Sequence, residues 1–115
     1  MRRGDVFVAT LAPRSGSEQV GTRPVIVVSH DAFNSTLGWR SVVVVPLSTS
    51  RSQARRGPTS VPIPAGAGGL AADGIALCHQ VTTLDRSKLV RWLGSLRRDH
   101  VVAIDGGLRA ALDLG

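Results

Sequence analysis

Short apolar runs, separated by polar segments with glycine and proline, dominate the first ninety residues of the chain. The runs are rich in β-branched residues and too short for helices, so they predict strands. We expect five or six strands, at Val6–Leu11, Pro24–Ser29, Ser41–Leu47, Thr59–Ile63, Ile75–Val81 and Leu89–Leu93. Because proline cannot donate to a ladder, the end of the third run at Pro46 is not expected to be central in a ladder.

The pattern changes near the C-terminus, where apolar residues recur at helical spacing. They are Val101, Ile104, Leu108, Ala111 and Leu112. This spacing predicts a helix with one apolar face against the sheet, weakened at Gly106 and Gly107 by about 1 kcal/mol per glycine relative to alanine.

Polar segments at residues 12–23 and 48–58 are expected to be loops, and Thr83–Arg86 a turn. With 115 residues, the chain is predicted to be one domain, residues 1–115. The expected fold is mainly β with a C-terminal helix (α+β), a small barrel-like sheet.

The charge of the chain indicates a polyanionic partner. Fourteen basic residues against eight acidic ones give a net charge of +6, and thirteen of the fourteen are arginine, the side chain suited to bidentate phosphate contact. A second interpretation also stands: a genome rich in arginine codons and a solvated surface. Aromatic residues make up only 3% of the chain, too few for a base-stacking platform on a sheet.

The cellular location is expected to be the cytoplasm. Cys78 is the only cysteine, so an internal disulfide is excluded and a reducing compartment is expected. Cys78 itself is most simply a small core residue. The N-terminus lacks the apolar core of a signal peptide, and no apolar stretch is long enough to cross a membrane.

General catalytic motifs give no result. His30, His79 and His100 are scattered without metal-ligand spacing, and there is no phosphate-binding loop or Gly-x-Ser-x-Gly turn. We expect neither a metal nor a cofactor. One feature stands out: Arg23, directly before Pro24 at the start of an apolar strand that has no structural need for a guanidinium, with Glu18 in the preceding loop.

A series of short motifs resembles the MazF/PemK toxins, the mRNA-cleaving endoribonucleases of type II toxin–antitoxin systems. The motifs are Arg3-Gly4-Asp5, Pro13, Gly16-Ser17-Glu18-Gln19, Gly21, Arg23-Pro24, Asn34, Val45-Pro46-Leu47-Ser48-Thr49, Asp73-Gly74-Ile75-Ala76-Leu77, Gln80-Val81 and Gly94. Their order and spacing cover nearly the whole chain. The resemblance implies an SH3-like barrel of the MazF/PemK/CcdB type and sequence-specific, ribosome-independent and metal-independent cleavage of single-stranded mRNA.

The resemblance also implies catalytic residues. Arg23 is the expected catalytic arginine, stabilising the charge of a pentacovalent phosphorane formed by attack of the RNA 2′-hydroxyl. Ser48 stands where the family has a threonine, and Thr49 takes that role if the register differs by one residue. The alternative is that this Ser-Thr-Ser segment only ends a strand. Glu18 is expected to accept the 2′-hydroxyl proton or to hold Arg23, with a solvated loop carboxylate as the alternative.

Further residues are expected to bind RNA by the same resemblance. They are Gln19, Thr49, Arg51, Arg55, Arg56, Gln80 and His79. For the three arginines, contact with the antitoxin or simple solvation is the alternative; for His79, an outward-facing strand residue is favoured. Trp39 is left as interface or core.

The expected partners are single-stranded RNA, a cognate MazE-like acidic antitoxin, DNA in complex with that antitoxin, and a second copy of the chain; no membrane is expected. Two other classes remain open: a non-enzymatic CcdB-like toxin that binds gyrase, and an RNA-binding barrel or decayed toxin. Arg23 with a hydroxyl at Ser48 argues against the first, since such a toxin needs neither.

Overall fold

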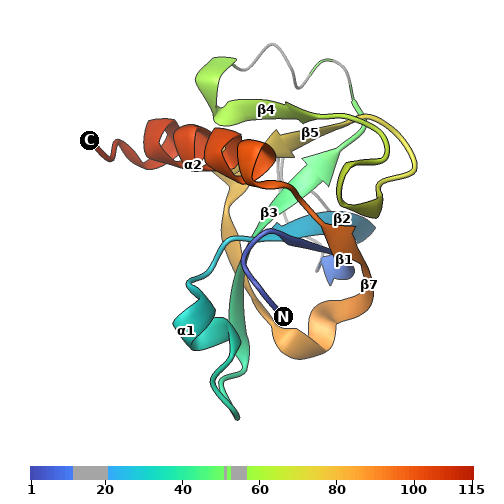
Figure 1. Ribbon diagram of the computed structural model, residues 1–115, viewed down its shortest axis with the longest axis vertical. Coiled ribbons are helices and arrows are strands. Elements are labelled where there is room, and N and C mark those ends of the chain that lie inside the picture. The colour runs from blue at the N-terminus through green and yellow to red at the C-terminus, as the bar shows by residue number, and fades with distance from the viewer. Residues whose placement is uncertain (12–20, 51, 53–56) are drawn as a thin grey trace.

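The computed structural model describes residues 1–11, 21–50, 52 and 57–115. Within these residues, seven antiparallel strands form one sheet, and the helix α2 (Arg98–Leu112) follows the last strand (Figure 1). The strands are β1 (Asp5–Leu11), β2 (Gly21–Val27), β3 (Ser41–Ser48), β4 (Ser60–Ile63), β5 (Gly74–Leu77), β6 (Thr82–Asp85) and β7 (Leu89–Ser95). The predicted class, mainly β with a C-terminal helix, is confirmed.

The strand order is β4-β5-β3-β2-β1-β7, and β6 pairs with β3. Along one edge of β3, residues 41–44 pair with β6 and the last two residues pair with β5, while β2 occupies the other edge. Val45 and Pro46 fall between these two ranges. Pro46 pairs with Val25 of β2 on one edge and lies in this gap on the other, so the expectation that it is not central in a ladder is confirmed, although β3 itself lies inside the sheet.

Alternate residues of the central strands point into two separate cores. Ile26 and Val45 belong to a core closed by Ile104 of α2, whereas Val25 and Val44 belong to a core on the other face. Both faces of β2 and β3 are thus buried, which is why their sequences are uninterrupted apolar runs.

Helix α2 packs against β4 and the short 3-10 helix η3 (Cys78–Gln80) (Figure 1). Ile104 is buried, and Val101, Leu108 and Ala111 pack around it as expected. Leu112, in contrast, is 52% exposed at the end of the helix, so its predicted core position is wrong. None of the helices in the described residues is long and apolar enough to cross a membrane.

Two predicted segments differ from the structure. The run Ile75–Val81 is a strand only as far as Leu77, and then turns through η3, which buries Cys78 beneath α2. The expected turn at Thr83–Arg86 is instead largely β6, paired with the first half of β3. Only one side chain of β6, Leu84, is buried, so the segment carries little apolar periodicity to reveal a strand.

The connection between β2 and β3 contains a one-turn helix, α1 (Asp31–Asn34), that was not predicted. The Ala32 N–H donates to Nδ1 of His30 at its start, and the Phe33 and Trp39 rings lie 5.2 Å apart. Trp39 is 46% exposed, so its interpretation as a core residue is wrong. Two more 3-10 turns, η2 (Ala67–Gly69) and η4 (Arg86–Lys88), precede β5 and β7.

Candidate active site

Arg23 lies inside β2, opposite Ala9 of β1, rather than in the loop predicted to end at this residue. Residues 21–23 are exposed and the strand is buried from Val25 onward. Val25 pairs with Pro46 of β3, and the same register continued by two residues would bring Arg23 opposite Ser48. The sheet itself therefore brings together two residues that are distant in sequence.

A hollow of about 170 Å³ lies at this place, and Arg23, Ser48 and Thr49 line it. The remaining lining is apolar or glycine: Pro24, Leu47, Leu70, Ala71, Ala72 and Gly74. Among these described lining residues there is no carboxylate. The hollow thus offers a guanidinium and two hydroxyls to a bound group, the arrangement that suits a phosphate.

The Ser48 hydroxyl is held in place by its surroundings. The residue is only 6% exposed, ends β3 and pairs with Ile75 of β5. Its Oγ accepts a hydrogen bond from the Ser50 N–H at 3.1 Å, which uses the oxygen as an acceptor and leaves the O–H proton to donate. Thr49 is exposed and less constrained.

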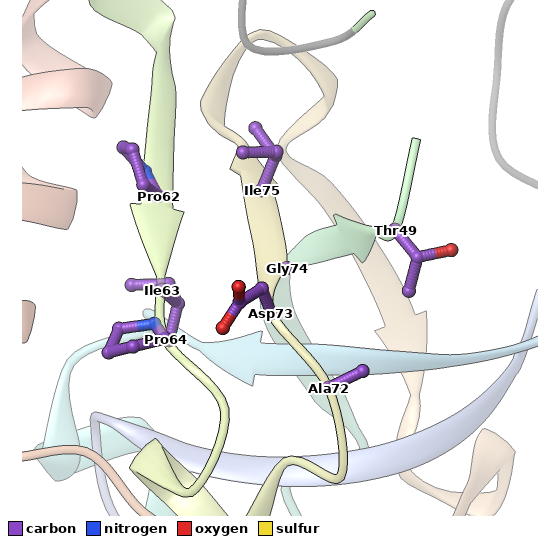
Figure 2. Close-up of a pocket in the computed structure, with 8 residues that line it drawn as sticks. All are labelled: Thr49, Pro62, Ile63, Pro64, Ala72, Asp73, Gly74 and Ile75. Atoms are coloured by element: carbon purple, nitrogen blue, oxygen red, sulfur yellow. The ribbon is translucent and has the colours of Figure 1, made fainter. Parts of the chain in front are cut away.

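A second, larger hollow of about 740 Å³ adjoins the first, because Thr49, Ala72 and Gly74 line both. Its other walls come from the end of β4 and the segment that leads into β5, and Asp73 stands among them (Figure 2). The sequence analysis gave Asp73 no role in a site. Asp73 appeared there only within a family motif, and only the fold places its carboxylate beside a hollow.

Gln80 and His79 were predicted to lie on a strand. They lie on η3 instead. The His79 Nδ1 lies 3.4 Å from the Thr59 Oγ1, next to the start of β4. The two hollows are at the other end of the β4–β5 pair, about 10 Å away along a four-residue strand. His79 and Gln80 are not among the described residues that line either hollow. The fold therefore does not bring these two side chains to Arg23 and Ser48.

Five other predicted site residues lie outside the described residues: Glu18, Gln19, Arg51, Arg55 and Arg56. Within the part of the chain that the structure does describe, no group of three or more histidine, cysteine or acidic residues could hold a metal ion. Burial raises the pKa of the Cys78 thiol to about 11, as expected for a core residue and not for a nucleophile.

A family model for the PemK-like, MazF-like toxin of type II toxin–antitoxin systems matches residues 2–112. The chain belongs to this family. It is 34% identical over 114 residues to the endoribonuclease MazF of Staphylococcus epidermidis, covering 99% of this chain and 92% of that protein.

The fold of this MazF/PemK-family chain is similar to solved members of the family. One is an endoribonuclease in complex with its cognate antitoxin from a mycobacterial species, with a TM-score of 0.79 and 28% identity over 100% of this chain and 97% of the other. Another is MazF of Deinococcus radiodurans, with a TM-score of 0.79 and 27% identity over 99% and 97% of the two chains. The interpretation as a non-enzymatic gyrase-binding toxin is not favoured.

Proposed function

We propose that this MazF/PemK-family toxin is an endoribonuclease that cleaves single-stranded RNA at the hollow between Arg23 and Ser48. The observation that carries the proposal is the meeting of an exposed guanidinium and an oriented hydroxyl in one small hollow. The family match and the relatives named endoribonuclease support the same activity.

The chemistry follows from what these groups can do. The 2′-oxygen of the RNA attacks the adjacent phosphorus, the bond from phosphorus to the 5′-oxygen breaks, and a 2′,3′-cyclic phosphate and a 5′-hydroxyl remain. Arg23 stabilises the additional negative charge of the phosphorane through two N–H donors, and the Ser48 hydroxyl donates a hydrogen bond to a third oxygen. An arginine is a poor acid because its pKa is above about 12, so we assign Arg23 to charge stabilisation rather than proton donation.

Two proton transfers complete the reaction: a base removes the proton of the 2′-hydroxyl, and solvent water supplies the proton that the departing 5′-oxygen gains. We propose Glu18, outside the described residues, as the base or as the group that holds Arg23. Thr49 remains the alternative to Ser48, because both line the hollow. Arg51, Arg55 and Arg56 are proposed to contact phosphates, consistent with the net charge of +6.

The proposed partners follow the family. We propose a MazE-like antitoxin whose acidic segment competes with RNA for the basic site, and a homodimer as the active form, acting in the cytoplasm. The solved mycobacterial relative in complex with its cognate antitoxin supports the first of these proposals.

The test is digestion of a defined single-stranded RNA by the purified protein in excess EDTA. Since the proposed groups supply all the charge stabilisation, we expect cleavage with a 2′,3′-cyclic phosphate and a 5′-hydroxyl. A DNA strand of the same sequence should survive, and a single deoxynucleotide on the 5′ side of the cut should block that cut alone. A strict requirement for Mg²⁺, or cleavage of the deoxy-substituted site, would contradict the proposal.

A further inference from the structure

The larger hollow beside the proposed cleavage site has the size and walls of a ligand site. Its volume of about 740 Å³ lies within the range of small-molecule pockets. Pro62, Pro64 and Ile75, the partner of Pro62 across the β4–β5 pair, form one side, and Thr49 and Ala72 stand on the other (Figure 2). Flat apolar surfaces of this kind suit the face of a planar ring.

Asp73 is the charged side chain among the described residues that line this hollow. The Ala65 N–H donates to its Oδ1 at 2.8 Å, which fixes the carboxyl group across the turn between β4 and β5. Oδ2 makes no hydrogen bond with any described residue, and the side chain is exposed. An ionised carboxylate only accepts hydrogen bonds, so a group that enters the hollow meets a fixed acceptor.

The two hollows lie next to each other on the protein surface and share part of their walls. Thr49, Ala72 and Gly74 line both, so an RNA strand whose phosphate lies at Arg23 and Ser48 can place an adjacent base beside Asp73. A carboxylate next to a phosphate site weakens binding of every RNA by charge repulsion. Its presence there is explained if it discriminates between bases instead of adding affinity.

We propose that this hollow binds a nucleobase next to the cleaved phosphate and that Asp73 selects guanine there and rejects uracil. This inference rests on the proposed ribonuclease function. Guanine presents two adjacent donors, N1–H and the N2 amino group, to the two oxygens of the carboxylate. Adenine and cytosine offer one amino group each, while the N3–H of uracil is flanked by two carbonyl oxygens that the carboxylate repels.

The decisive variant is Asp73→Asn, since the amide keeps one oxygen to accept the Ala65 N–H and replaces the other by a donor. An amide donor favours the carbonyl oxygens of uracil. Asp113→Asn is the matched control: it removes the same charge at an exposed residue beyond α2, where the backbone φ of 54° is one that asparagine tolerates. Both variants change the net charge equally, so a change of base preference found only in Asp73→Asn does not come from net charge.

The experiment is digestion of a random single-stranded RNA library by the parent protein and both variants, with sequencing of the cut ends. In the parent and in Asp113→Asn, we expect guanine to be favoured over uracil by about tenfold or more at one position next to the cut. In Asp73→Asn this ratio should fall towards one at that position alone, with the preferences at the other positions unchanged.

The outcomes separate this inference from the proposed function. If the parent cuts RNA and Asp73→Asn, folded by circular dichroism, keeps the same base profile at every position, the assignment of Asp73 is wrong and the ribonuclease proposal stands. A preference for uracil at every position flanking the parental cut also overturns it. If the folded parent leaves RNA intact, the proposed function fails and this inference fails with it.

Discussion

Two adjacent glycines in α2 should respond in opposite ways to the same substitution. Gly106 is exposed, and a Cβ built on it meets no atom within 4 Å. Gly107 is buried, and a Cβ there would lie 2.6 Å from the Cys78 Sγ and 2.9 Å from the Val61 Cγ2. The absence of a side chain at Gly107 is what lets α2 approach η3 and β4 so closely.

The magnitudes follow from one shared effect and one local effect. Replacing glycine by alanine inside a helix stabilises by about 1 kcal/mol at either position. Only at Gly107 does the added methyl group overpack the core, at a cost of about 1–3 kcal/mol, because both neighbours are fixed by their own packing. Gly106→Ala should therefore raise the free energy of unfolding by about 1 kcal/mol. The free energy of unfolding of Gly107→Ala should be about 1–3 kcal/mol lower than that of Gly106→Ala.

Equilibrium urea unfolding at one fixed protein concentration measures the difference, and fixing the concentration keeps any dimer contribution constant. The expected gap corresponds to roughly 4 °C in melting temperature for each kcal/mol. In a Cys78→Ala background the contact with sulfur is gone, so the loss caused by Gly107→Ala should shrink. Equal stability of the two alanine variants would refute the close packing of α2 described here.

Two further predictions concern the active site and the surface. Ser48→Ala should slow RNA cleavage by about 10²–10³-fold, as for loss of one oxyanion donor, while Ser48→Thr should retain at least the parental rate. If Ser48→Ala is active and Thr49→Ala is inactive, the role belongs to Thr49 instead. The Arg40 guanidinium, 2.9 Å from Asp85, lowers the pKa of that carboxyl below its ordinary 3.8, so its contribution to stability is present above about pH 4 and is lost as the pH falls further. Asp85→Asn should therefore flatten the decline of unfolding free energy below pH 4, and an unchanged decline would show that the pair contributes nothing.

The central strands could be predicted from sequence because both of their faces are buried. Val25 and Val44 need no periodicity to be recognised as strand residues, since an uninterrupted β-branched run is sufficient. Strand β6 could not be found in this way, because its single buried residue, Leu84, leaves a polar segment whose structure depends on pairing with β3. The turn after Leu77 was missed because Cys78 is buried by α2, a contact distant in sequence.

The candidate site was predicted in part. Arg23 and Ser48 were identified from family motifs, and the register of β2 and β3 gives the physical reason why they line one hollow. Gln80 was expected on a strand near the bases, but the strand ends three residues earlier. Asp73 was quoted within a family motif but given no role, because the role proposed for it depends on the adjacency of two hollows, which is a property of the folded chain only.

The most direct test of the account is the single-turnover rate at which Arg23→Ala cleaves one defined RNA in EDTA, compared with the parent. We expect a loss of about 10²–10³-fold, with Arg23→Lys recovering only part of it because an ammonium cannot bind two phosphoryl oxygens in a fork. Arg91→Ala is the matched control, an exposed arginine on the edge strand β7, and should keep nearly the parental rate. Cleavage by folded Arg23→Ala at the parental rate would contradict the account and leave Arg23 as a surface charge.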